Sequence, residues 1–270
     1  MQIAFWSRVG GQGGTTSAAA AHGAMLALAH PVKVLLAQVQ GETLERCFFS
    51  RRDAQPGPGS YGGYVEGGME ALLRLARNNR LGTGDFADYT VPLLKQGKLD
   101  LLQGHGSLDA QGLALLPQVL ETAGRCYDLV VLDFPNGRGH PGGELLERAD
   151  LLVFCLNQNI HVLEGHVKEV LLEKRPAPKD HLCHINFYRK ELKASEGNLR
   201  RQLLEKELLR LPYDPGFQDA CNQGGLLEFL IRHVDRPSGE KGHPFLESLK
   251  RNTTLLMDRM ERGGGRWIQD

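Results

Sequence analysis

The sequence predicts a single α/β domain over residues 1–270, with a mostly parallel, twisted sheet and helices on both of its faces. Short apolar runs rich in β-branched residues alternate with longer helical patterns, which is the rhythm of βαβ units. A length of 270 residues is normal for one such sheet and its helices. The sequence shows no internal repeat and no linker long enough to divide the chain, so we expect one domain.

The apolar runs place seven strands, at 2–7, 32–39, 99–103, 128–133, 151–157, 182–187 and 208–211. Helical patterns cover 15–28, 69–78, 111–123, 161–173, 198–206 and 244–261. The stretch 50–68 contains GPGS and YGGYVEGG, which cannot hold a regular element, so we expect an irregular surface excursion there.

A glycine-rich turn, VGGQGGTTS at 9–17, joins the first strand to the first helix. In a phosphate-binding loop, glycines turn backbone N–H groups inward and the helix terminus adds partial positive charge. A lysine then reaches the phosphates, and a Ser or Thr hydroxyl binds Mg²⁺. Thr15 stands at the hydroxyl position, but Gly14 stands at the lysine position. On this stretch alone, a turn that merely packs is an equal alternative. The candidate phosphate-binding residues are Gly10, Gly11, Gln12, Gly13, Gly14, Thr15 and Thr16.

A second segment favours the phosphate interpretation. YDLVVLDFP at 127–135 is an apolar strand that ends in Asp133, the arrangement of a Walker B segment, whose aspartate holds Mg²⁺ through water. We therefore expect Thr15 and Asp133 to be the metal-binding pair.

The order of these segments resembles the MinD/ParA group of deviant-Walker P-loop proteins. The resemblance covers nearly the whole chain and is carried by VGGQGGTTS, YDLVVLDFPNG (127–137), ADLLVFCL (149–156), INFYRK (185–190) and LPYDPGFQDACNQGG (211–225). Within the group the chain looks most like the CpaE/TadZ-type pilus-assembly proteins. The resemblance implies a three-layer P-loop NTPase-like fold, ATP or ADP with Mg²⁺ as ligand, homodimerisation, and protein partners in a pilus or secretion machine.

The chain also departs from the family pattern. The family's two loop lysines align with Val9 and Gly14, and its Asp-x-Asp pair aligns with Gln38-Val39-Gln40. Loss of one charge-stabilising group costs on the order of a hundredfold in rate. Asp133 and Gln40 remain as catalytic candidates, and we expect weak or no hydrolysis with weak or absent nucleotide binding. Arg8 is either a substitute cation or a solvated arginine at a strand end.

The resemblance assigns two residues to the adenine base. Asn186 matches the asparagine that reads the adenine edge, and Asp214 lies in the segment that closes the other side of the base. A polar strand end followed by a turn is the alternative. Two other functions stay open: a slow ATPase in positioning or DNA partitioning, and a module that binds another anion.

The composition indicates which classes of binding partner the sequence favours and which it argues against. The 32 lysines and arginines balance 32 aspartates and glutamates, so no global field favours nucleic acid or anionic lipid. A local basic cluster, Arg200, Arg201, Lys206 and Arg210, is interleaved with acids and favours a solvated helix face over a DNA contact. The ten histidines show no metalloenzyme spacing, and the five cysteines are widely separated, which argues against a disulfide framework or a zinc site.

No leader-like segment precedes the first strand and no run of about 18 apolar residues is present, so we expect a cytoplasmic protein. The final helix carries an apolar stripe at helical spacing. Packing on the sheet is the favoured interpretation of this stripe. Peripheral membrane contact at the inner face of the cell membrane is the alternative, which Trp267 in the tail would support.

Overall fold

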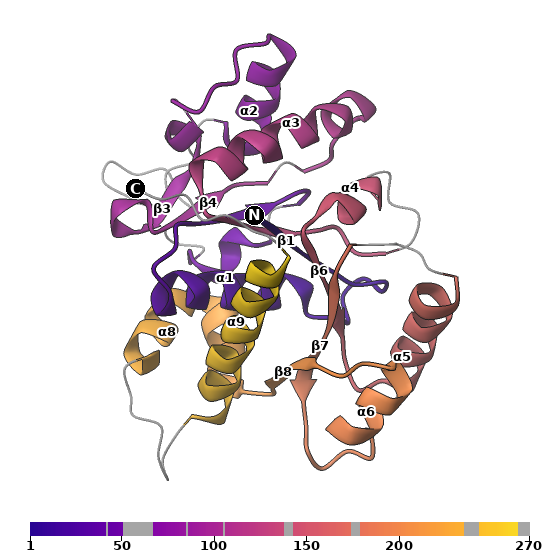
Figure 1. Cartoon of the computed structure of the whole chain (residues 1–270). Helices are drawn as coiled ribbons and strands as arrows, with labels where there is room; N and C mark the ends of the chain where they lie inside the picture. Colours follow the sequence, from indigo (N-terminus) through magenta and orange to yellow (C-terminus); the bar gives the residue numbers. More distant parts are fainter. Residues whose placement is uncertain are drawn as a thin grey trace.

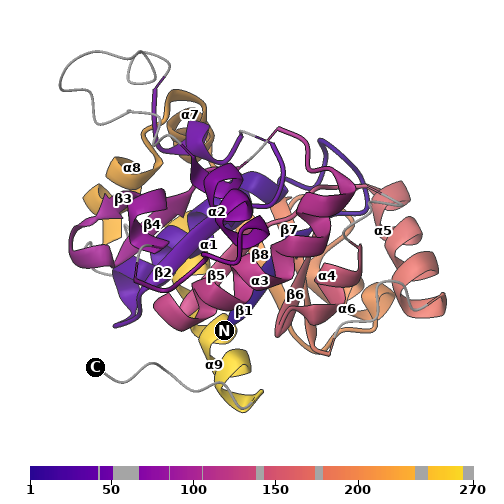
Figure 2. The same ribbon diagram turned by 90° about the horizontal axis from the view of Figure 1, so that it is seen from above.

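The computed structural model describes residues 1–41, 43–50, 67–84, 86–104, 106–137, 143–173, 179–234 and 243–263. Within this part of the chain, eight strands form one sheet in the order β3-β4-β2-β5-β1-β6-β7-β8 (Figures 1 and 2). All neighbouring strands are parallel except β3, which is antiparallel to β4. The strands are β1 Gln2–Trp6, β2 Val34–Gln38, β3 Val91–Leu94, β4 Leu99–Leu102, β5 Leu129–Asp133, β6 Leu151–Leu156, β7 His181–Tyr188 and β8 Leu208–Pro212.

Helices cover both faces of the sheet, as predicted (Figure 1). The α-helices are α1 Thr15–Ala29, α2 Gly68–Arg77, α3 Ala110–Cys126, α4 Gly143–Arg148, α5 Ile160–His166, α6 Glu196–Leu203, α7 Pro215–Gln223, α8 Leu226–Val234 and α9 Pro244–Arg262. Short 3₁₀ turns lie at η1 Glu45–Cys47, η2 Phe86–Tyr89 and η3 Lys95–Gly97, and the π-helical η4 spans Val167–Leu172.

The core consists of two apolar layers, because successive side chains of a strand point to opposite faces. Ile3 and Phe5 of β1 join the layer under α1, α7, α8 and α9. Ala4 and Trp6 join the layer under α2 to α6. The alanines of α1 let this helix lie close against the sheet, and Gly23 has no room for a Cβ, which would lie 2.4 Å from Leu36 Cδ2.

The structure also contains elements that the sequence patterns did not predict. β3 is a short edge strand with Pro92 in it, which the sheet tolerates only at an edge. α4, α7 and α8 were not predicted either, although Asp214, Pro215 and Gly224 are ordinary start and stop signals for α7. The expected helix 161–173 is in fact α5 followed by the π-helical η4. Most of the expected excursion at 50–68 lies outside the described residues.

The final helix packs on the sheet. Its apolar stripe, from Phe245 to Met260, is buried against α1 and β8. Asn252 is 1% exposed, and its side-chain amide donates to the carbonyl oxygen of Arg210 over 3.0 Å. The packing interpretation therefore holds for 244–262, whereas Trp267 lies outside the described residues. Among the described helices, none is long and apolar enough to cross a bilayer.

Two further expectations concern charged and titratable groups. Arg200 of α6 and Arg210 of β8 both pair with Glu196, over 2.6 and 2.7 Å, so an acidic side chain accompanies this part of the basic cluster. His166 and His184 are buried, and burial lowers their pKa, to about 4 for His166, so both rings are neutral at pH 7. In the described part of the chain, no group of three or more histidine, cysteine or acidic residues could hold a metal.

Candidate functional site

The glycine-rich loop runs from the end of β1 to the start of α1, at the carboxyl edge of the sheet. Gly11 and Gly14 adopt left-handed φ values of 71° and 62°. Gly13 is buried, and a Cβ at this position would lie 2.5 Å from Ser7 Oγ. Gly14 precedes α1 without a side-chain cap, so the first N–H groups of the helix have no side-chain acceptor at that position. The loop therefore keeps the backbone form of an anion-binding turn.

Three asparagines from the neighbouring strand ends hold this loop. Asn136, after β5, accepts from the Ser7 N–H over 3.0 Å and from the Thr15 hydroxyl over 2.9 Å. Asn157, after β6, donates to the Gln12 carbonyl oxygen over 3.0 Å, and Asn186 of β7 donates to the Gly13 carbonyl oxygen. Because a trans peptide unit points its C=O and N–H in opposite directions, these bonds also fix the direction of the Gly13 and Gly14 N–H groups. The loop conformation is thus set by side chains outside it.

An aromatic ring covers the lysine position. A Cβ added to Gly14 would lie 2.8 Å from Phe187 Cζ and 3.4 Å from Asn186 Nδ2. Phe187 has a left-handed φ of 54°, which costs a non-glycine residue about 1–3 kcal/mol. Its side chain remains 39% exposed. A lysine at this position would therefore meet both the ring and an unfavourable backbone conformation.

The carboxylate of Asp133 is engaged by protein donors. The Thr16 hydroxyl and the Gln38 side-chain amide each donate to Asp133 Oδ2 over 2.8 Å. Parallel pairing of β2 with β5 places Gln38 directly opposite Asp133, which explains the contact. The side-chain oxygen of Gln38, Oε1, in turn accepts from the backbone N–H groups of Thr43 and Leu44. The Gln38 side chain is uncharged, so it does not neutralise the Asp133 carboxylate, but its amide supplies a hydrogen-bond donor to this buried group without a cation.

Burial raises the pKa of Asp133 to about 6, and the bonds from Thr16 and Gln38 oppose this rise. The side chain is 3% exposed. At pH 7 the carboxylate is therefore largely ionised, but at a cost to stability.

A magnesium triphosphate does not fit these residues as they are arranged. The Thr15 hydroxyl is directed to Asn136, Asp133 accepts from two protein donors, and the lysine position is covered by Phe187. The backbone N–H groups and the helix terminus still suit an anion. Gln40, the second catalytic candidate, lies half-buried just beyond β2, while Gln38 is the residue bonded to Asp133.

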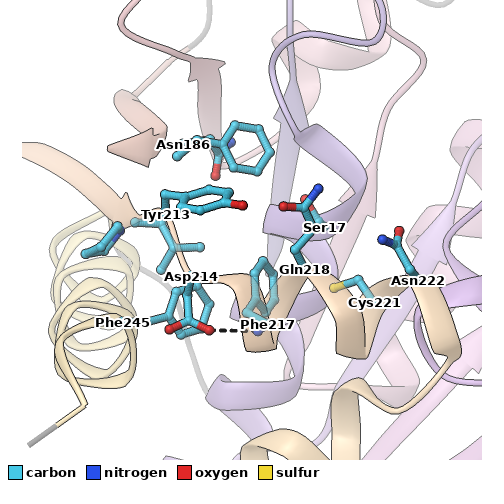
Figure 3. Close-up of a pocket in the computed structure, with 12 residues that line it drawn as sticks. Ser17, Asn186, Tyr213, Asp214, Phe217, Gln218, Cys221, Asn222 and Phe245 are labelled. Atoms are coloured by element: carbon cyan, nitrogen blue, oxygen red, sulfur yellow. Dashed lines mark hydrogen bonds between the residues drawn. The ribbon is translucent and has the colours of Figure 1, made fainter. Parts of the chain in front are cut away.

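A cavity of about 180 Å³ adjoins the loop. It is lined by aromatic and amide side chains from β7, the end of β8, α7 and α9, among them Phe187, Tyr213, Phe217, Gln218, Asn222 and Phe245 (Figure 3). Asn186 and Asp214 both line it, as their predicted role at a base requires. In the structure Asp214 caps α7 by accepting from the Phe217 N–H over 2.7 Å. Their contact with a base stays a prediction.

Arg8 is not directed at the loop. Its guanidinium packs over Gly165 and its Nε lies 3.6 Å from Glu169 Oε2, against the helical segment α5–η4. Neither the substitute-cation interpretation nor the solvated one describes it, because the side chain is only 16% exposed.

The residues that sequence reasoning missed are Gln38 as the partner of Asp133, Phe187 as the cover of Gly14, and Asn136 and Asn157 as loop supports. Their positions at strand ends were the available signal.

The contact between Phe187 and Gly14 can be tested against a matched glycine. Gly11→Ala should cost about 1–2 kcal/mol of unfolding free energy, since it places a side chain at positive φ with no other atom within 4 Å. Gly14→Ala should cost about 1–3 kcal/mol more, because its Cβ also meets the ring. In a Phe187→Ala background this excess should vanish. Urea unfolding of the single and double variants measures it, and an excess that persists without the ring would refute the contact.

Neither a protein-family model nor a curated protein sequence matches the chain. Solved structures do. A ParA family ATPase from Chlorobium tepidum TLS has a TM-score of 0.70 at 15% identity, over 94% of this chain and 98% of that one. MinD in the MinC:MinD complex of Aquifex aeolicus has 0.70 at 16% identity, over 96% of both chains. MinD of Pyrococcus horikoshii OT3, complexed with Mg-ADP, has 0.64 at 15% identity, over 96% of this chain and 99% of that one. The chain therefore has the fold of the MinD and ParA P-loop ATPases.

Proposed function

We propose that this protein is a degenerate MinD/ParA-like factor that localises or assembles a pilus or secretion machine and hydrolyses ATP weakly or not at all. It works through protein contacts rather than turnover. The observation that carries the proposal is the candidate site itself: Phe187 covers the lysine position at Gly14, and Gln38 occupies the carboxylate of Asp133.

Exposed apolar side chains support a protein partner. Phe187, Tyr213 and Leu192, 39%, 38% and 46% exposed, follow or end β7 and β8 at the same edge of the sheet as the loop. Ile160, 51% exposed, begins α5 just after β6. Exposed apolar side chains at these strand ends suit association with another protein or with a second copy of this chain. The resemblance to CpaE/TadZ-type proteins supplies the pilus or secretion machine as the setting.

A slow ATPase in positioning or DNA partitioning is the second candidate. Retention of Thr15, Thr16 and Asp133 around a glycine loop favours it, because these residues could change partners when a nucleotide binds. This candidate predicts Mg²⁺-dependent phosphate release.

Equilibrium binding of ATP, ADP and AMP, each with and without Mg²⁺, separates the two candidates when combined with phosphate release. We expect weak binding that Mg²⁺ hardly changes, and phosphate release by the wild type no faster than by Asp133→Ala. Mg²⁺-dependent release that Asp133→Ala abolishes would contradict the proposal and support the ATPase. Binding of other anions with no preference for adenine would instead indicate an anion-binding module.

A further inference from the structure

The cavity beside the loop has an apolar floor and a polar rim (Figure 3). Phe217 and Phe245 are both buried, and their ring centroids lie 4.3 Å apart. Gln218 and Asn222 of α7 lie at the exposed side of the same cavity. A cavity of about 150 Å³ with apolar walls can take a benzene ring. The cavity here, of about 180 Å³, therefore has room for one aromatic ring of a ligand.

The amide groups at the rim are available to a ligand. In the part of the chain that the structure describes, the side-chain amides of Gln218 and Asn222 make no hydrogen bond. Asp214 is the one carboxylate among the described lining residues. It already accepts from the Phe217 N–H over 2.7 Å, and it lies 3.6 Å from His243 Nε2. The described lining residues include no cation, so the interior suits an uncharged group that can exchange hydrogen bonds with amides.

A cation is fixed just outside the cavity. The guanidinium carbon of Arg189 lies 4.5 Å from the ring centroid of Tyr213, which lines the cavity. The Gln158 side chain holds the Arg189 backbone, because it accepts from the Arg189 N–H over 2.7 Å and donates to the Arg189 carbonyl oxygen over 3.0 Å. Among the described residues, no carboxylate pairs with Arg189. The segment 189–193 carries three basic residues and one acidic residue, so this side of the cavity suits a negatively charged group.

Exposed apolar side chains continue the surface beyond the cavity. Phe187 and Tyr213 line the cavity and are also exposed to solvent. Leu192, which is exposed as well, follows Arg189 in the same short segment. A small molecule that filled the cavity would leave Leu192 in water, whereas a polypeptide that continued past the rim would cover it. The combination favours a protein segment over a free small ligand.

We propose that the cavity is the docking site of a partner protein, which inserts one aromatic side chain into it and places a carboxylate against Arg189. The proposal rests on the proposed function, because it names the chemistry of the protein contact through which the chain acts. An aromatic anchor in an apolar pocket with a polar rim is the usual form of a binding hot spot. A nucleotide base, which the predicted roles of Asn186 and Asp214 require, is the competing occupant.

The test measures the fluorescence anisotropy of a fluorescein-labelled peptide, in which two glutamates flank a tryptophan on each side, as the native full chain is added. We expect saturable binding at protein concentrations below about 1 mM. Alanine in place of the tryptophan should weaken binding about tenfold or more, since the anchor carries most of the binding energy. Lysines in place of the glutamates should weaken it about threefold to tenfold. Absent binding of the first peptide, or equal binding of the alanine peptide, would overturn the proposal.

Two variants of the chain locate the site. Gln218→Trp fills the cavity from an exposed position on α7, and we expect it to lower the affinity for the peptide about tenfold or more. Arg189→Glu should lower this affinity about threefold to tenfold, and it should bind the lysine peptide more tightly than the wild type does. Arg201→Glu, at an exposed arginine of α6, is the matched control and should leave the affinity unchanged. Unaltered affinity in either of the first two variants would contradict the proposal.

Unlabelled adenosine and ATP separate this inference from the proposed function. If adenosine binds the wild type, Gln218→Trp abolishes that binding and the peptide does not bind, the cavity takes a base and the inference is wrong. The proposed function, which is judged by phosphate release, is not affected by that result. Conversely, Mg²⁺-dependent phosphate release would refute the proposed function, whereas the docking site is judged by the two peptides and the variants alone.

Discussion

Asp133→Asn is expected to be more stable than the wild type at pH 8, by about 3 kcal/mol of unfolding free energy. The folded-state pKa of Asp133 is raised to about 6 from 3.8, chiefly by burial. Each pKa unit corresponds to about 1.4 kcal/mol. An asparagine keeps an oxygen that can accept from the Thr16 hydroxyl and the Gln38 amide, so the variant removes the buried charge and retains the hydrogen bonds.

The direction of the pH effect follows from proton linkage. Between pH 3.8 and about 6 the folded protein binds a proton at Asp133 that the unfolded chain has released, so stability falls as pH rises through this window. Above about pH 6 the loss is complete and constant. The advantage of Asp133→Asn should therefore be full at pH 8 and largely absent near pH 4. Urea unfolding at both pH values measures it, and an equal advantage at both would show that the raised pKa is not the cause.

This result would bear on function as well as on stability. The ionised carboxylate of Asp133 would then lower the stability of the fold at pH 7, although it accepts hydrogen bonds from Thr16 and Gln38. Contact of Asp133 with a cation or a polar ligand stays a prediction, since a perturbed pKa occurs at functional sites and in structural networks alike.

Much of the architecture could be predicted from the sequence because its signals are local. β-branched apolar runs between helical patterns predicted β1, β2 and β4 to β8, and each predicted strand end lies no more than two residues from the observed one. β3 could not be predicted, since it is an edge strand with Pro92 and exists only by pairing with β4. α7 was hidden because its residues, from Asp214 to Gly224, were interpreted as a family motif rather than as helix start and stop signals.

The candidate site was predictable only in its backbone. The glycines, Thr15 and Asp133 lie together at the carboxyl edge of the sheet, as βαβ topology requires. The contact that covers the lysine position at Gly14 could not be predicted, because it comes from Phe187 of β7, far away in the sequence. Pairings of this kind depend on tertiary structure and carry no periodic signal.

The second large effect is expected at the junction of α9 with the cavity. Phe245 is 1% exposed, and its ring centroid lies 4.3 Å from that of Phe217 and 6.1 Å from that of Phe229. Phe245→Ala removes these contacts and leaves a void beside the existing cavity, so it should cost about 3–5 kcal/mol of unfolding free energy. Urea unfolding measures the loss.

Tyr213→Ala is the matched control, because Tyr213 lines the same cavity but is 38% exposed. Its ring carries the Arg189 guanidinium at 4.5 Å from the centroid, a contact worth about 0.5–1 kcal/mol at an exposed site. The alanine variant should therefore lose far less stability than Phe245→Ala. Equal losses would mean that Phe245 is not anchored in the core.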